Sequence, residues 1–382
     1  MILHRLTLTI LGAGVVLGDI AGVGGVGAQE ARVRTLGRPQ AEHRLPFSSI
    51  DGVRELTDGR VIVADSREVR VAVVDFAAGT SVQTGREGRG PGEYLRPLAL
   101  FGAPADTTLV FDAGNRRLLV LDPAGRPVGV RSASFSPSPG VTYTLRPRAS
   151  DHSGRLYVQL AVASADSEPV LRFTPGEARV DTVAFVRGPD FHYAGQQQGG
   201  VGMRVGQALP FAPRDDWYAG PSGEVAVVRA SEYRVVWHSV GAPSVMGPPV
   251  PQERIPITEA DKEQWRRSMA ADAAGIAVRQ GRADGGAGRP VRVTVPEPPA
   301  WPAFKPPFVP ESARIAPDGR LWVRRHRPAA DAAARYDVFD RAGRVVEHVV
   351  LPAGTRLVGF GRGAVYLARE TDDGLQFLQR HR

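Results

Sequence analysis

Short stretches in which apolar and polar residues alternate, separated by turn residues, recur along most of the chain. The first clear set precedes residue 84 and lies at 53–56, 61–65, 69–75 and 81–83. Alternation with a period of two, bounded by turns rich in Gly and Asp, is typical of β-strands. The pattern therefore predicts four short strands joined as one antiparallel meander.

The same meander repeats further along the chain. Asp65 and Asp75 recur as Asp112 and Asp122, each shifted by 47 positions. The first hairpin turn of each unit falls at 59, 106, 154, 223, 319 and 363, in steps of 47, 48, 69, 96 and 44. A period in the mid-forties matches four-stranded propeller blades. We therefore predict an all-β, six-bladed β-propeller of four-stranded antiparallel blades, with insertions in the two long steps.

The two ends of the chain suggest how the ring closes. The sixth unit stops after its third strand, at Leu375–Leu378, and would leave an unpaired edge, which is a liability for β proteins. Residues 31–36, around Val33, alternate like a strand and have no partner nearby. We expect this N-terminal strand to be the fourth strand of the last blade.

The two insertions lie at about 188–214 and 243–310, within a single propeller domain that spans residues 29–382. The first contains Gln196–Gly200 and is predicted to be an irregular loop. The second carries one helix, since Thr258 can cap its start with an acidic residue three positions later.

Good helix formers follow over 262–279, until glycines end the helix. Residues 296–310 are rich in proline and cannot form a central strand. We expect this segment to lie extended across the propeller, with its aromatic side chains packed on the blade ends.

Composition agrees with this fold and limits the partners. The 44 Gly and 32 Pro indicate many turns. The net charge of +8 comes almost entirely from Arg, but the basic residues are scattered and no nucleic-acid-binding motif accompanies them. We expect no nucleic-acid partner. With no Cys, the chain can form neither a disulfide nor a thiolate zinc site.

Residues 1–28 have the pattern of an export signal. His4 and Arg5 precede the apolar run Leu6–Leu17, and small residues at 26–28 allow cleavage before Gln29. The apolar run is too short and too polar to span a membrane, although an uncleaved anchor is the alternative. We expect a monomeric protein outside the cytoplasm, periplasmic or secreted, with no transmembrane segment after cleavage.

One segment carries a family resemblance. Gly85–Tyr94, Pro97 and the following 111–122 resemble the NHL-type repeat, in which a glycine-rich run, an aromatic residue and Pro precede an Asp, an Asn-Arg pair and an apolar strand. The chain is similar to exported bacterial six-bladed β-propeller proteins of the NHL-repeat and TolB-like group. The full match covers residues 85–125. The resemblance implies the fold rather than a reaction, because this group includes scaffolds, binders of protein, RNA or carbohydrate, lactonases and lyases.

The glycine-rich segment Gly85–Pro97 lacks the Lys-Ser/Thr ending of a phosphate-binding loop and is interpreted as a crossing between blades. We expect Arg86 and Glu93 to pair. The candidates to contact a ligand at one mouth of the channel are Arg86, Arg89, Glu93 and Tyr94. Further candidates are Trp217 and Trp301, which lie beside the insertions, and Lys305, one of only two lysines.

The leading functional prediction is a binding module for a protein, peptide or carbohydrate ligand, which needs no cofactor. The alternative is a metal-dependent hydrolase or lyase, similar to propeller lactonases, with carboxylates at the channel mouth. Calcium or zinc would then be held by Asp65, Asp112 and Asn115, which by another interpretation bond turn amides. A third possibility is a structural element of an envelope complex.

Overall fold

The computed structural model describes residues 31–382 except 139, 162–165, 178, 195–204, 271–296 and 332. Residues 31–382 form one compact unit. The export-signal prediction falls on residues outside the described part of the chain.

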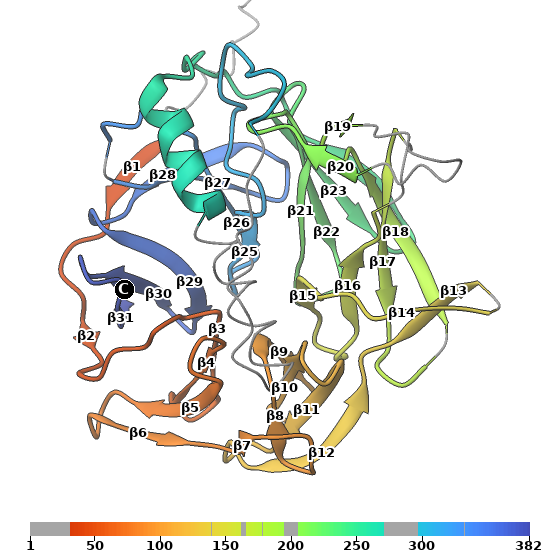
Figure 1. The fold of residues 1–382 in the computed structure, drawn as a ribbon, viewed down its shortest axis with the longest axis vertical. Helices are drawn as coiled ribbons and strands as arrows, with labels where there is room; N and C mark the ends of the chain where they lie inside the picture. Colours follow the sequence, from red (N-terminus) through yellow and green to blue (C-terminus); the bar gives the residue numbers. More distant parts are fainter. Residues whose placement is uncertain are drawn as a thin grey trace, which may run out of the picture. The chain divides into compact units, whose positions relative to one another are not determined.

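Six four-stranded antiparallel sheets are arranged as a ring around a central axis (Figure 1), which confirms the predicted six-bladed propeller. Each blade begins with its innermost strand. Blade 1 comprises β3 (Gly52–Glu55), β4 (Val61–Asp65), β5 (Arg70–Asp75) and β6 (Thr80–Gln83). Blade 2 comprises β9 (Pro97–Ala103), β10 (Thr107–Asp112), β11 (Arg117–Leu121) and β12 (Pro127–Ser132). Blade 3 comprises β15 (Ala149–Ser150), β16 (Leu156–Gln159), β17 (Glu168–Phe173) and β18 (Val180–Val186).

The other three blades follow the same order. Blade 4 comprises β21 (Asp216–Ala219), β22 (Val225–Arg229), β23 (Arg234–Ser239) and β24 (Ala242–Met246). Blade 5 comprises β25 (Arg314–Ile315), β26 (Leu321–Arg324), β27 (Arg335–Phe339) and β28 (Val345–Val350). Blade 6 has β29 (Thr355–Gly361), β30 (Ala364–Glu370) and β31 (Gln376–His381) from the C-terminal end of the chain.

The N-terminal segment closes the ring, but with a different strand from the one predicted. The fourth strand of blade 6 is β2 (Ala41–Glu42), which pairs antiparallel with β31. The segment around Val33 forms β1 (Arg32–Thr35), which pairs parallel with β28 as a fifth strand of blade 5. The prediction that residues 31–36 complete the last blade is therefore wrong. Both segments are short. Leu36, which lies between them, is buried, and the course of the chain at this point places β1 on blade 5 and β2 on blade 6.

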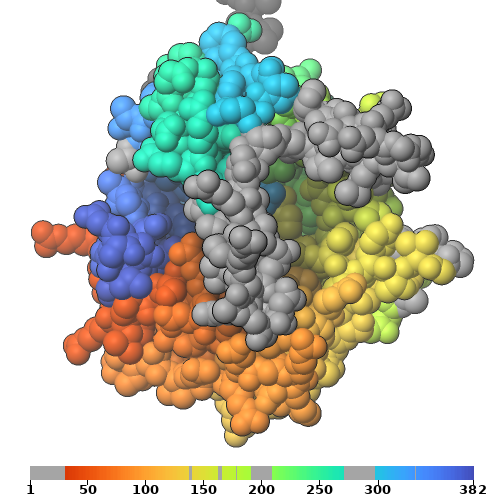
Figure 2. Space-filling view, in the orientation of Figure 1, coloured from red at the N-terminus to blue at the C-terminus, as the bar shows by residue number. Residues whose placement is uncertain are grey.

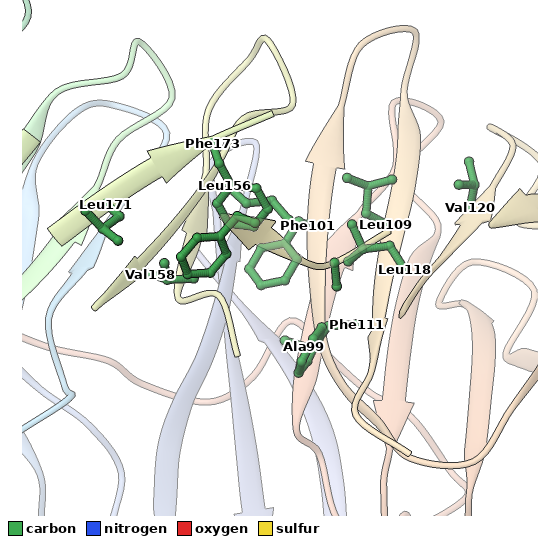
Figure 3. Packing of buried hydrophobic residues seen from close by; sticks show 12 residues of the cluster. Ala99, Phe101, Leu109, Phe111, Leu118, Val120, Leu156, Val158, Leu171 and Phe173 are labelled. Atoms are coloured by element: carbon green, nitrogen blue, oxygen red, sulfur yellow. The ribbon is translucent and has the colours of Figure 1, made fainter. Parts of the chain in front are cut away.

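The core lies between neighbouring blades as well as within them. Figure 3 shows the layer between blades 2 and 3, where Phe101, Phe111, Leu118, Leu156 and Phe173 are all buried. These residues come from the alternating apolar positions of the strands, so each blade presents an apolar face to the next. Such packing of sheet on sheet holds the ring without disulfides.

An even number of antiparallel strands places every connection from an outer strand to the next inner strand on one face of the ring. We call it the crossing face; it carries the connections 84–96, 133–148, 187–215, 247–313 and 351–354. Both predicted insertions lie on it. The first was predicted to be an irregular loop, but its described part contains the antiparallel pair β19 (Phe191–Ala194) and β20 (Val205–Ala208). Residues 196–200 lie outside the described part.

The second insertion contains the predicted helix, which occupies 259–270 in the described part of the chain. The backbone N–H of Thr258 donates to Oδ2 of Asp261 at 2.9 Å, and the backbone N–H of Asp261 donates to Thr258 Oγ1 at 3.4 Å, which is the expected capping arrangement. The helix stands beside the proline-rich segment on the face seen in Figure 2. In that segment Phe308 is buried against blades 4 and 5.

Two small elements complete the crossings. The strands β7 (Arg86–Glu87) and β8 (Glu93–Tyr94) pair parallel within the connection between blades 1 and 2. The strands β13 (Phe135–Ser138) and β14 (Val141–Tyr143) pair antiparallel between blades 2 and 3.

Candidate functional site

A cavity of about 780 Å³ occupies the centre of the ring and is lined by residues from all six blades. Most of them lie on, or just before, the innermost strand of a blade. Because these strands start at the crossing face, the residues that precede them surround the mouth of the cavity on that face. Asp51, Arg146, Asp215, Glu311 and Arg314 occupy such positions.

Two arginines in this cavity have no carboxylate partner among the described residues. Nη2 of Arg146 donates to the carbonyl oxygen of Leu98 at 3.2 Å, and Nη1 of Arg314 donates to the carbonyl oxygens of Glu311 at 3.1 Å and Ala313 at 2.8 Å. The Arg314 guanidinium also lies over the ring of Tyr218, 5.2 Å from its centre. Backbone carbonyl oxygens therefore hold both guanidinium groups, and the face of Tyr218 adds to this for Arg314.

A third arginine, Arg356 at the start of β29, lies close to them. Its Nη2 donates to the Ile50 carbonyl oxygen and to Oε1 of Gln376, both at 2.8 Å. Burial lowers the pKa of Arg356, and the nearby charge of Arg314 lowers it further. Burial and the charge of Arg314 likewise lower the pKa of Arg146, although its side chain is open to the water of the cavity. The three like charges thus disfavour one another, and a bound anion would relieve this repulsion.

Asp51 is the carboxylate whose charge acts most strongly on Arg146 and Arg356. Its Oδ2 accepts a hydrogen bond from the backbone N–H of Ser66 at 2.8 Å. Its negative charge opposes the pKa shifts of both Arg146 and Arg356. Among the described residues, no ion pair within 4.0 Å holds the Asp51 side chain. The side chain is half-buried and lines the cavity. Within the described residues Asp51 is therefore held by a backbone N–H and not by an arginine.

The neighbouring Arg148 is held firmly. Its Nη2 lies 2.7 Å from Oδ1 of Asp216, and its guanidinium lies 5.0 Å from the centre of the Trp217 ring. Trp217 is one of the predicted ligand-binding residues, but it is fully buried, and its Nε1 donates to Oε1 of Gln159 at 2.6 Å. It supports the cavity wall from behind.

The candidates from the glycine-rich segment do not line this cavity. Arg86 and Glu93 form the expected ion pair at 2.7 Å, and the Arg86 side chain is 80% exposed. Arg89 is also exposed. Tyr94 is completely buried, where its hydroxyl accepts from the backbone N–H of Val71 at 3.0 Å and donates to the Thr84 carbonyl oxygen at 2.9 Å. The segment runs from the outer strand of blade 1 to the inner strand of blade 2, so its interpretation as a blade crossing is confirmed.

The two remaining candidates lie in the proline-rich insertion. Trp301 packs edge-on against Trp265 of the helix, with ring centres 5.3 Å apart. Lys305 is buried, and its Nζ lies 2.6 Å from Oδ1 of Asp261 and donates to the Arg327 carbonyl oxygen at 2.8 Å. Neither residue lines the central cavity.

The residues considered for calcium or zinc do not fit a metal ion. Asp112 Oδ1 accepts from the backbone N–H groups of Leu95, Arg96, Gly114 and Asn115, and its Oδ2 accepts from the Asn115 amide. Asp65 similarly accepts from backbone N–H groups around its own turn. No group of three or more His, Asp or Glu side chains that could hold a metal ion is present in the part of the chain described here.

Sequence reasoning missed Asp51, Arg146, Arg314 and Arg356. A usable signal was present, because all four lie five to eight residues before the hairpin-turn markers at 59, 154, 319 and 363. That offset is where an inner strand begins at the crossing face. Residues at this offset in each repeat could therefore have been predicted to lie at the mouth of the cavity.

No protein-family model matches the chain, and no curated protein matches it in sequence. Solved structures do share its fold. A virginiamycin B lyase from Staphylococcus aureus covers 90% of this chain and 98% of its own, at 8% identity and a TM-score of 0.40. A gluconolactonase from Xanthomonas campestris covers 91% of both chains, at 9% identity and a TM-score of 0.42. A protein of Bacteroides fragilis, described as a candidate for export, covers 91% of this chain and 93% of its own, at 12% identity and a TM-score of 0.45.

These comparisons correct the leading functional prediction. The leading prediction was a module that binds a ligand or a protein, whereas the named structures include a lyase and a gluconolactonase. At these identities, and with TM-scores no higher than 0.45, the similarity carries no argument about a reaction, which has to be argued from the cavity of this chain. Within the described residues, no helix is long and apolar enough to cross a membrane. The chain is a six-bladed β-propeller whose central cavity carries two arginines that no described carboxylate pairs with, beside Asp51.

Proposed function

We propose that this protein is an enzyme of the hydrolase or lyase class that acts on an organic anion in the central cavity. One observation carries the proposal: the guanidinium groups of Arg146 and Arg314 face the cavity without a carboxylate partner among the described residues. The other three arginines that line the cavity, Arg54, Arg148 and Arg214, each pair with Asp or Glu. Arginine that is left unpaired in a cavity is suited to bind an oxyanion.

The same groups support a chemical step. When water attacks a lactone or ester carbonyl, a base takes the proton of the water and negative charge develops on the carbonyl oxygen. As the carbonyl re-forms, the C–O bond to the alcohol breaks and the alkoxide takes the proton from the base. When a proton is removed from carbon beside a carboxylate, the charge develops on the carboxylate oxygens, and formation of the carbon–carbon double bond expels the leaving group from the next carbon, which takes the proton. Asp51 would act as the base in either case, and Arg146 and Arg314 would stabilise the charge.

The alternative of the sequence analysis included a metal ion. Oxygens of Asp65 and Asp112 accept from backbone N–H groups, and the side-chain amide of Asn115 donates to Asp112 and to the Gly88 carbonyl oxygen, so these residues take no part in the proposed step. The proposed chemistry depends on side chains of the cavity alone.

The proposal is tested with a panel of lactones and esters that carry a carboxylate, and of substrates for elimination beside a carboxylate. Asp51→Asn should lower kcat by about 10²- to 10⁴-fold, the range for loss of a general base. Arg146→Gln should raise KM. Arg86→Gln, which changes an exposed arginine outside the cavity, is the matched control and should leave both constants unchanged. An absence of turnover across the panel, or full activity of Asp51→Asn, would overturn the proposal.

We also propose that the protein works outside the cytoplasm as a monomer and belongs with the exported NHL-repeat and TolB-like propellers. The apolar pattern of residues 1–28 and the similarity in fold to a candidate exported protein support this location. N-terminal sequencing of protein recovered from the periplasm or medium should begin at Gln29. Light scattering on that material tests the oligomeric state.

A further inference from the structure

Most polar side chains that line the cavity are already satisfied by partners in the protein. Asp216 pairs with Arg148, Asp215 with Arg229 at 2.6 Å, and Arg54 with Asp106 at 2.7 Å. Likewise Asp151 pairs with Arg155 at 2.7 Å, and Glu168 bonds the amide of Gln159. These groups shape the wall, but their hydrogen-bonding capacity is largely used.

The surface that remains has two parts. One part is the pair of unpaired arginines, Arg146 and Arg314, with Asp51 beside them. The other part is a set of half-buried apolar or aromatic side chains from blades 1, 2, 4 and 6, namely Val53, Leu100, Tyr218, Val358 and Phe360. A cavity with a positively charged end and an apolar wall is complementary to a molecule that has a negatively charged group and an apolar body.

The free edge of Arg314 indicates the kind of charge. Its Nη1 is occupied by two backbone carbonyl oxygens, which leaves Nε and Nη2. These two nitrogens form the edge of a guanidinium that binds both oxygens of a planar carboxylate. The backbone bonds also hold the guanidinium in place, so little side-chain freedom would be lost on binding.

Building on the proposed function, we propose that the substrate is an amphiphilic carboxylate. Its carboxylate binds Arg146 and Arg314, and its alkyl or aryl body lies along the wall formed by Val53, Leu100, Val358 and Phe360. A volume of about 780 Å³ has room for such a body, since cavities for small ligands commonly measure about 300–1,000 Å³.

Calorimetry with straight-chain carboxylates tests this inference without requiring turnover. From butanoate to octanoate, affinity should rise with each methylene, by up to about fourfold if the group is fully buried. Arg314→Gln should weaken octanoate binding at least tenfold and leave octanol binding unchanged. Val358→Thr keeps the shape of the side chain and adds a hydroxyl, so it should reduce the gain per methylene. Arg86→Gln is the control outside the cavity and should bind as the unmodified protein does.

The outcomes separate this inference from the proposed function. The proposal of an amphiphilic carboxylate is overturned if affinity does not depend on chain length. It is also overturned if affinity is unchanged in both Arg314→Gln and Arg146→Gln while these variants remain folded. Tighter binding of octyl phosphate than of octanoate overturns the choice of head group. Turnover of short, polar carboxylates with no effect of chain length would overturn only this inference. Chain-length-dependent binding without turnover of any panel compound would overturn only the proposed function.

Discussion

The Nζ atom of Lys305 lies 2.6 Å from Oδ1 of Asp261, and the two side chains are only 5% and 3% exposed. This pair joins the first turn of the inserted helix to the proline-rich segment that follows it. Burial alone would raise the pKa of Asp261, but the hydrogen bonds from Lys305 and Thr258, together with the charge of Lys305, lower it. The same lysine donates to the Arg327 carbonyl oxygen, so it also fixes the insertion to blade 5.

Replacing Lys305 with Met should destabilise the insertion by about 3 kcal/mol, because the buried Asp261 carboxylate would lose its only cationic partner among the described residues. Adding Asp261→Asn should recover part of the loss. Urea unfolding followed by tryptophan fluorescence reports on it, since Trp265 and Trp301 lie in this region.

The other lysine of the chain provides the control. Lys262 pairs with Glu259 at 2.7 Å and lies over the Trp301 ring at 5.8 Å, but Glu259 is 78% exposed, so Lys262→Met should cost no more than about 1 kcal/mol. Equal losses for the two lysine variants would contradict the assignment of a structural role to Lys305.

Stability should fall as the pH drops from 8 to 5, in part because of His326. Burial, and then the charge of Lys305, lower the pKa of His326 from 6.5 to about 4. Between pH 6.5 and about pH 4, His326 is protonated in the unfolded chain but stays neutral in the folded protein. The free energy of unfolding therefore decreases as the pH falls. The contribution of this one histidine is about 2 kcal/mol between pH 8 and pH 5.

The measurement is a set of thermal or urea unfolding curves at several pH values. His326→Gln should flatten the slope between pH 6.5 and pH 4, since it removes the group that titrates only in the unfolded chain. His152, which is exposed, provides the matched control, and His152→Gln should retain the slope. An unchanged slope in His326→Gln would contradict the prediction.

Closure of the ring should depend on β2 more than on β1. A chain that starts at residue 39 loses the fifth strand of blade 5 and buried Leu36, but it keeps the pairing of Ala41 and Glu42 with β31. We expect it to fold with a lower Tm. A chain that starts at residue 49 also loses β2 and the buried Phe47, which leaves an open edge on blade 6.

We expect the shorter chain to unfold without a cooperative transition, or to self-associate through that edge. Circular dichroism melts and light scattering of the two truncated chains distinguish them. Identical melting of the two chains would show that β2 does not close the ring.

In the glycine-rich crossing, loss of the buried Tyr94 hydroxyl should reduce stability, whereas loss of the exposed Arg86 charge should not. Tyr94→Phe removes two hydrogen bonds and leaves the backbone N–H of Val71 without its acceptor, which should cost about 1–2 kcal/mol. Arg86→Ala should leave the melting temperature unchanged, because the side chain is 80% exposed. A large effect of Arg86→Ala, with none of Tyr94→Phe, would reverse this interpretation of the segment.

The fold could be predicted from the sequence pattern alone. The 47-residue repeat, the turn residues and the alternation of apolar and polar residues all reflect local backbone preferences. These features recur in every blade because each blade packs against its neighbours in the same way. The capping of the helix by Thr258 and the pairing of Arg86 with Glu93 could also be predicted, since both depend on residues close in sequence.

Only the tertiary structure decided which residues meet at the axis. Asp51, Arg146, Arg314 and Arg356 come from four different blades. Their offset from the hairpin turns indicates the mouth of the cavity, but it does not distinguish an unpaired arginine from a paired one. The same holds for the choice of β2 over β1 in blade 6, and for the burial of Lys305 against Asp261. In each case the interaction depends on ring closure, which brings together segments far apart in sequence and removes them from bulk water.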